Sequence, residues 1–169
     1  PVDFVSLDVG CLRLGFLAAS ADLVPYLVRL KQAADLHSNR ISQWIVLQQL
    51  SDSHRQQRLA RLVAGYRHKR DAFGAVLDEQ FGELASWETP AGGLFFWLTL
   101  KHAVDTRTLL PEALARGVAF MPGEYFHPHM GDGLGTLRLN FSHAGTAEAQ
   151  RGLAILAELL RRPAPRIPA

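Results

Sequence analysis

The chain has 169 residues, of which 48% are hydrophobic, so it is long enough for one well-buried core and for no more than two lobes. Its formal net charge of +2 is too small to indicate nucleic acid or an anionic membrane as a partner. The single cysteine, Cys11, excludes a disulfide framework and a cysteine-based metal site, and it favours a reducing compartment. No apolar run is long enough to span a bilayer. We therefore expect a cytoplasmic protein without a membrane partner.

The first third of the chain predicts one strand followed by two helices. Residues Cys11–Ala19 are mostly apolar, as in a strand that is covered on both faces. Ser20 or Asp22 caps a helix that runs to about Asp35. A second helix carries the apolar side chains of residues 41–50. Because a single strand has no partner here for its edges, this part of the chain is expected to belong to something larger.

From Ser53 onward, helices and strands alternate. Ser53 caps a long helix that ends before Gly82. The later elements are three strands and two helices: strand 94–100, helix 106–116, strand 118–121, strand 137–142 and a helix that Thr146 caps. This order predicts an α/β fold, or α+β sandwich, in which helices pack on one face of a small sheet. A proline-rich tail follows from Pro163.

The last predicted strand, Leu137–Ser142, places Arg138 and Asn140 on one face and its apolar side chains on the other, because successive side chains alternate. A guanidinium held on a rigid strand is suited to bind a carboxylate through two parallel N–H···O bonds. On the strand alone, an arginine that points into solvent is the simpler interpretation. The motifs that surround this strand favour the binding role.

Four motifs occur in a fixed order along the chain. They are Leu12-Arg13-Leu14-Gly15, then Pro90-Ala91-Gly92-Gly93-Leu94-Phe95-Phe96-Trp97-Leu98, then Gly117-Val118 with Met121-Pro122-Gly123, and finally Leu137-Arg138-Leu139-Asn140-Phe141-Ser142. Together they resemble the C-terminal half of fold-type I aminotransferases that depend on pyridoxal phosphate (PLP), from about Gly10 to Arg162. The most similar subgroup comprises the 2-aminoadipate and kynurenine aminotransferases, together with the aminotransferase-like domains of GntR/MocR-type regulators.

The resemblance implies a division of the chain and a role for two arginines. Residues 1–52 would be the end of the large domain with interdomain helices, 53–162 the small domain, and 163–169 the tail. Arg138 falls where the family binds the α-carboxylate of the substrate, and Arg13 falls where the family contacts the cofactor phosphate. An arginine on a buried strand needs an anionic partner in any case. From the residues alone, an internal salt bridge with a carboxylate of the same chain is the simpler interpretation of Arg13.

The Schiff-base lysine of the family has no counterpart here. Seven residues before Arg13 stands Ser6, and Asp3 replaces a phosphate-facing serine and would repel a phosphate dianion. The sequence holds three lysines, all on elements expected to be remote from this position: Lys31, Lys69 and Lys101. A serine cannot form an imine. We therefore predict no catalytic residue in this chain, and neither activity nor cofactor binding by the chain alone.

For the parent protein, the resemblance implies pyridoxal 5′-phosphate as cofactor, transfer of an amino group between an α-amino acid and a 2-oxo acid, and a homodimer. The chain, which begins at Pro1 without methionine, would then be a fragment. Two alternatives stay open. One is the effector-sensing and dimerisation domain of a GntR/MocR-type transcriptional regulator, with nucleic acid bound only by an upstream domain. The other is a truncated chain that only binds a partner.

The remaining candidates for chemistry are weaker. His127, His129 and Asp132 have the residue types of metal ligands, but they lie in a loop rich in glycine and proline without a further ligand to complete a shell. We therefore predict no metal site. Cys11 lacks a base next to it in the sequence, and His143 is interpreted as a structural residue.

Overall fold

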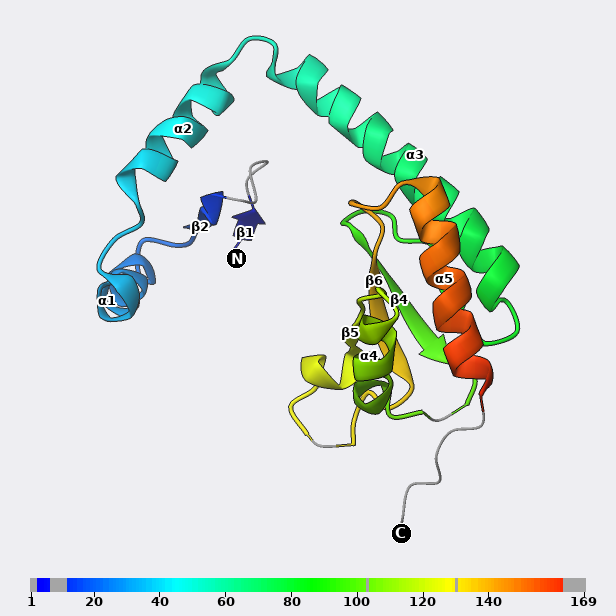
Figure 1. The fold of residues 1–169 in the computed structure, drawn as a ribbon. Helices are drawn as coiled ribbons and strands as arrows, with labels where there is room; N and C mark the ends of the chain where they lie inside the picture. Colours follow the sequence, from blue (N-terminus) through cyan, green and yellow to red (C-terminus); the bar gives the residue numbers. More distant parts are fainter. Residues whose placement is uncertain (1–2, 7–11, 103, 130, 163–169) are drawn as a thin grey trace. The chain divides into compact units, whose positions relative to one another are not determined.

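The computed structural model describes residues 3–6, 12–102, 104–129 and 131–162 (Figure 1). Cys11 and the predicted tail, 163–169, lie outside the described residues. The chain forms two compact units, Pro1–Ala60 and Arg61–Ala169, and the boundary between them falls inside helix α3 (Arg55–Phe81). Each unit is described by itself.

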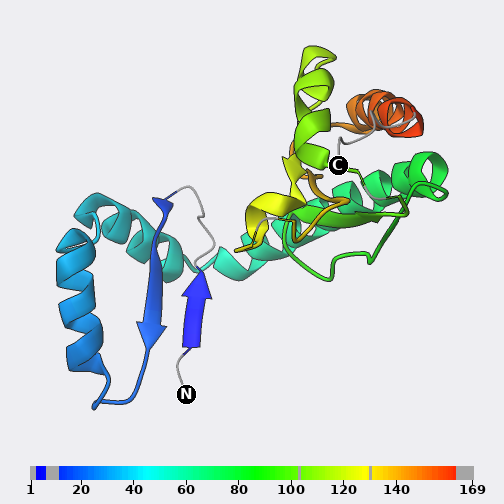
Figure 2. The ribbon, with the colours of Figure 1, turned by 90° about the horizontal axis from the view of Figure 1, so that it is seen from below.

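The first unit contains a two-stranded antiparallel sheet, which Figure 2 shows beside helices α1 (Val24–Asp35) and α2 (Arg40–Ser51). Strand β1 (Asp3–Ser6) pairs with strand β2 (Gly15–Ala18). The prediction of one unpaired strand over Cys11–Ala19 is therefore wrong in length and in pairing.

The physical reason for the shorter strand lies at Arg13. This residue has a φ of 52°, in the left-handed region, and a strand cannot contain that conformation. Its side chain is exposed, so the prediction of a buried arginine on this strand is also wrong.

The first unit buries little of its apolar surface. Among its described hydrophobic side chains, only Val46 of α2 is buried. Large apolar side chains of α1, α2 and the turn between them are exposed: Tyr26, Leu30, Leu36, Ile41, Trp44, Leu47 and Leu50. These apolar stripes therefore supply almost no core within this unit.

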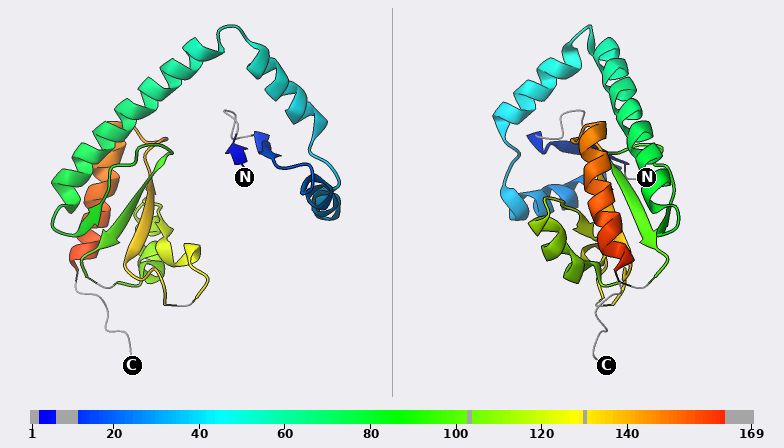
Figure 3. Two further views of the ribbon diagram at one scale, coloured as in Figure 1. Left: turned by 180° about the vertical axis from the view of Figure 1, so that it is seen from behind. Right: turned by 45° about the vertical axis from the view of Figure 1, so that its right-hand side comes forward.

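The second unit is built on a four-stranded antiparallel sheet. Its strands lie in the order β3 (Ala85–Trp87), β4 (Phe95–Leu100), β6 (Thr136–Asn140) and β5 (Met121–Pro122). Helices α3 and α5 (Thr146–Arg161) cover one face of the sheet, as Figure 3 shows, and α4 (Thr106–Ala115) lies against α5 and β5. The predicted architecture, with helices on one face of a small sheet, is confirmed.

Several boundaries differ from the predictions for local reasons. Strand β3 was not predicted, because its last residue, Trp87, begins the segment 87–93, whose proline and glycines indicate a turn. Strand β5 is shorter than the predicted strand 118–121 and begins later. Strand β6 ends at Asn140 because the side chain of Asn140 accepts hydrogen bonds from the backbone and hydroxyl of Ser142. Helix α5 has Gly145, rather than Thr146, at its N-cap.

The core of the second unit forms between the covered face of the sheet and helices α3 and α5. Phe96 of β4 is fully buried, with its ring stacked on Phe73 at 5.6 Å and edge-on to Phe141 at 5.7 Å. The other large, fully buried side chains of this core are Leu77, Phe81, Leu98, Leu137 and Leu156. Within the described part of the chain, none of the helices has the length and hydropathy of a membrane-spanning helix.

A carboxylate on α5 ties this helix to α4. Glu158 accepts hydrogen bonds from Arg116 (2.6 Å) and Arg162 (2.8 Å). The bond from Arg116, and then that from Arg162, lowers the pKa of Glu158 from 4.5 to about 2. A carboxyl group with a lowered pKa in the folded state stabilises the fold above its unfolded pKa, and this contribution is lost as the pH falls towards the folded value.

We therefore expect Glu158→Gln to lower the Tm of the chain at neutral pH and to lose this effect in acid. The difference in Tm between the two proteins should shrink as the pH falls from 4.5 to about 2, as measured by circular dichroism. The effect is small, because the side chain of Glu158 is 52% exposed. A difference that stays constant through this pH range would contradict the assignment.

Candidate functional site

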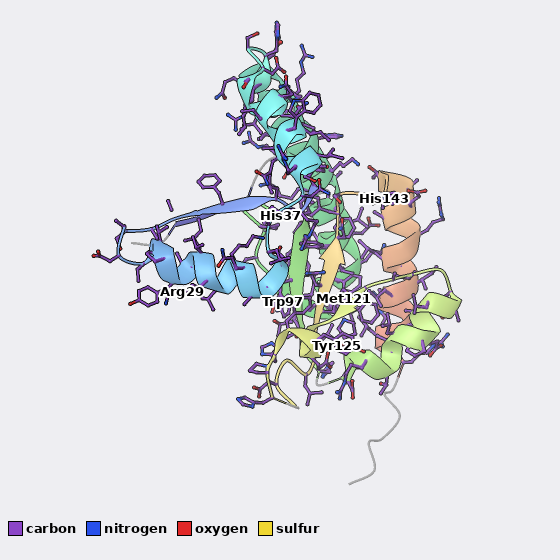
Figure 4. The ribbon with its side chains drawn as sticks, turned by 90° about the vertical axis from the view of Figure 1, so that its left-hand side faces the viewer. Arg29, His37, Trp97, Met121, Tyr125 and His143 are labelled. Carbon is purple, nitrogen blue, oxygen red and sulfur yellow. The ribbon has the colours of Figure 1, made fainter. Side chains whose placement is uncertain are left out.

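The uncovered face of the four-stranded sheet carries an arginine among large apolar side chains. Arg138 of β6 pairs with Trp97 of β4 on one side and with Met121 of β5 on the other. Trp97 and Met121 are 37% and 41% exposed, and Figure 4 shows both on this part of the second unit. An apolar sheet face that stays open next to a cation is a candidate ligand site.

The Arg138 guanidinium rests against two aromatic rings. Its Cζ atom lies 4.0 Å from the ring centroid of Phe95 and 4.6 Å from that of Phe126. Both distances are within the range of cation–π attraction. The side chain is half-buried, and among the residues that the structure describes it forms no ion pair or hydrogen bond. Its N–H groups therefore remain free for an acceptor that the chain does not itself supply.

The second ring comes from a short 3-10 helix, η2 (Gly123–Phe126), which follows β5 directly. Phe126 contacts the ring of Trp97 edge-on at 5.4 Å, and His127 lies 6.5 Å from the same indole. The aromatic surface around Arg138 is thus assembled from β4, β6 and η2.

Arg13 belongs to the first unit and Arg138 to the second, so the structure does not bring these two predicted site residues together within one unit. Arg13 stands just before β2, exposed, and has no hydrogen bond or ion pair among the described residues. An internal salt bridge, the simpler expectation from its residue type, is therefore not formed within that part of the chain.

The loop that follows η2 does not gather metal ligands. His127, His129 and Asp132 are all exposed, and no three His, Cys, Asp or Glu side chains cluster within the described ranges. His143 is also exposed, rather than packed in the core. A groove of about 490 Å³ lies elsewhere, in the first unit, and is lined by Leu14, Arg40, Gln43, Trp44, Val46, Leu47 and Leu50.

The three lysines of the sequence all have partners within the fold. Lys31 pairs with Asp35 at 2.6 Å, Lys69 donates to the carbonyl oxygen of Ser142 at 2.7 Å, and Lys101 donates to that of Gly82 at 2.8 Å. Each amine therefore serves a local structural contact.

Sequence reasoning identified Arg138 but missed the aromatic side chains around it. Alternation within β4 places Phe95 and Trp97 on the same face, and this signal was present in the sequence. No signal in the sequence indicated that Phe126 approaches Arg138, because this contact depends on how η2 folds back over β6.

The fold is that of a class of proteins, the PLP-dependent aminotransferases. A solved structure of the α-aminoadipate aminotransferase LysN from Thermus thermophilus, complexed with N-(5′-phosphopyridoxyl)-L-leucine, superposes with a TM-score of 0.83 and 29% identity. The match covers 95% of this chain and 41% of that one. The sequence profile of the family described as aminotransferase class I and II matches residues 9–156. The chain belongs to this family.

Two curated relatives show how much of such a protein the chain spans. It is 34% identical over 149 residues to aromatic-amino-acid aminotransferase 1 of Thermococcus litoralis, covering 88% of this chain and 36% of that protein. It is 34% identical over 145 residues to the 2-aminoadipate transaminase of Thermus thermophilus, covering 84% of this chain and 36% of that protein. The resemblance to the 2-aminoadipate and kynurenine aminotransferases is confirmed, and the chain spans about a third of their length.

Proposed function

We propose that the chain is the substrate-carboxylate lobe of a PLP-dependent aminotransferase that moves an amino group between an α-amino acid and a 2-oxo acid. Arg138 carries the proposal: it is a half-buried guanidinium on an open sheet face, with no acceptor among the described residues. A carboxylate is the anion whose two oxygens match such a fork. Membership in the aminotransferase family supplies the reaction class.

In this role, Arg138 binds and orients the substrate and does not perform proton transfer. Two N–H···O bonds fix the direction of the carboxylate, and this fixes the rest of the amino acid relative to the reacting group. The rings of Phe95 and Phe126 shield part of the guanidinium from water and so strengthen its attraction for an anion. When bound in a complete protein, PLP would supply the electron sink for the chemistry.

We assign the remaining parts of the chain to the same complete protein. Residues 1–52 would close the large domain and link it to the small domain, 53–162. The exposed apolar stripes of α1 and α2 support this assignment, because they lack a core of their own. Arg13 would contact the cofactor phosphate, and its left-handed backbone is the kind of constrained conformation that often accompanies a binding role. A cytoplasmic homodimer completes the proposal.

The purified 169-residue chain is expected not to retain PLP. After incubation with the cofactor and gel filtration, its absorption spectrum should show no protein-bound pyridoxal band, because Ser6 occupies the lysine position and the three lysines have local partners. Ser6→Lys, reduced with borohydride and mapped by mass spectrometry, is expected to place label on residue 6. Stoichiometric label on the unchanged chain would refute the assignment of Ser6.

The amino-transfer proposal itself is tested in the longest form of the protein that its gene encodes. That protein, with PLP added, is incubated with a mixture of 15N-labelled amino acids and 2-oxoglutarate. Mass spectrometry should detect 15N in newly formed glutamate, and Arg138→Ala should greatly reduce it. Absence of transfer with any amino donor and several 2-oxo acids would overturn the proposal.

A regulator is the second candidate. The chain is 29% identical over 151 residues to a protein described as an HTH-type transcriptional regulator, YisV of Bacillus subtilis. The match covers 89% of this chain and 31% of that protein. The two aminotransferases named above match at 34% identity, which favours the enzyme. A DNA-binding segment upstream of Pro1 in the gene would favour the regulator instead.

A further inference from the structure

A buried carboxylate lies at the base of the segment that covers Arg138. Glu124, in the first turn of η2, is only 8% exposed. Its Oε1 accepts the backbone N–H of Thr106 at 3.1 Å, and its Oε2 accepts the Thr106 hydroxyl at 2.6 Å. Thr106 is itself fully buried at the start of α4, and its hydroxyl also lies 3.0 Å from the carbonyl oxygen of Thr136. One cluster thus joins η2, α4 and β6.

The backbone of η2 sits tightly against β6 at the same place. A Cβ atom added to Gly123 would lie 1.7 Å from the Thr136 hydroxyl oxygen, a distance that no side chain tolerates. Gly133, at a φ of +76°, leaves similarly little space beside His127. The glycines and the Glu124–Thr106 pair therefore fix η2 in one position over the start of β6.

This position decides where Phe126 lies. Phe126 ends η2, two residues after Glu124, and its ring is 4.6 Å from the Arg138 Cζ and 5.4 Å from the Trp97 ring. The side chain of Phe126 is 45% exposed, so burial alone does not hold it. If η2 were released, this ring would leave the guanidinium, and Arg138 would keep contact with Phe95 alone.

We propose that Glu124 and Thr106 are positioning residues for Arg138, because their hydrogen bonds hold η2 so that Phe126 keeps the guanidinium in one orientation. The proposal rests on the proposed function of Arg138 as the carboxylate-binding residue. A guanidinium held in one orientation loses less conformational freedom when it binds a planar acceptor, so its affinity for a carboxylate is higher.

The test follows the side-chain Nε–H resonance of Arg138 by NMR in the 169-residue chain, assigned through its loss in Arg138→Lys. Phe126→Leu removes the ring and calibrates the change in chemical shift that its loss causes. Glu124→Ala and the milder Thr106→Val are expected to move the resonance in the same direction as Phe126→Leu. Glu124→Gln should leave it in place, because the amide oxygen can still accept the Thr106 N–H and its NH₂ can donate to the hydroxyl.

The matched control is Glu148→Ala. Glu148 also accepts a backbone N–H, that of Gly145 at the start of α5, so its removal weakens a helix terminus without touching η2. It should lower the Tm and leave the Arg138 resonance unchanged. In a parallel titration with 3-phenylpropanoate, Glu124→Ala should bind about tenfold more weakly than the wild type, and Glu124→Gln should match the wild type.

The outcomes separate the two proposals. If Phe126→Leu moves the Arg138 resonance but neither Glu124→Ala nor Thr106→Val does, the positioning role is overturned while carboxylate binding stands. If the wild-type chain binds 3-phenylpropanoate no better than Arg138→Ala does, the carboxylate role fails, and the positioning role fails with it. If Glu124→Ala shifts the Arg138 resonance and weakens binding, and Glu124→Gln behaves like the wild type in both measurements, the positioning role and the carboxylate role are both supported.

Discussion

Arg138→Ala is expected to weaken productive binding of a carboxylate substrate by about 2–5 kcal/mol, the cost of truncating one partner of a desolvated charge pair. At 1.4 kcal/mol for each factor of ten, this is a loss of about 30- to 4,000-fold in kcat/KM. The effect is large because Arg138 is half-buried against Phe95 and Phe126, where water screens the pair less than on an open surface. The measurement is steady-state kinetics of the longest form of the protein.

Two further variants make this result specific. Arg138→Lys keeps the charge but loses the planar fork, so it should recover only part of the lost affinity. Arg151→Ala removes an equal charge from an exposed position on α5, a helix that packs on the opposite face of the sheet, and should leave the kinetics unchanged. Equal losses in Arg138→Ala and Arg151→Ala would mean that net charge, rather than a specific contact, attracts the substrate.

Phe96→Ala is expected to lower the free energy of unfolding of the second unit by about 3–5 kcal/mol. Phe96 is fully buried, and its ring stacks on Phe73 and meets Phe141 edge-on, so truncation leaves a cavity and removes two aromatic contacts. A loss of this size is a large part of the 5–15 kcal/mol that stabilises a typical domain. Urea denaturation monitored by circular dichroism measures it.

The neighbouring residue is the control for this prediction. Phe95→Ala alters the opposite, open face of the same strand, where the ring is 37% exposed. It should cost much less in unfolding free energy than Phe96→Ala, and its main effect should appear at Arg138, which loses one of its two rings. If both variants are destabilised alike, the two faces of β4 are not the buried and open faces described above.

The sequence predicted the second unit better than the first. Strand β4 was predicted from a run of apolar and aromatic residues, and helices α3 and α5 from apolar residues at helical spacing. The pairing of β1 with β2 was missed, because an apolar run such as Cys11–Ala19 shows neither where a strand ends nor what it pairs with. The left-handed backbone of Arg13 interrupts the predicted strand, and the identity of this residue, an arginine, does not indicate that conformation.

The candidate site divides in the same way. The roles of Arg138 and of Ser6, at the position of the family's lysine, were predicted from the sequence through the resemblance of its ordered motifs to the family, and both stay predictions. Only the tertiary structure showed that Phe95 and Phe126 flank the guanidinium and that Glu124 anchors η2 on Thr106. Periodicity and spacing along the chain specify which face of an element is apolar. Contacts between elements far apart in sequence depend on how β4, β6 and η2 pack together, and that packing is settled only when the whole sheet forms.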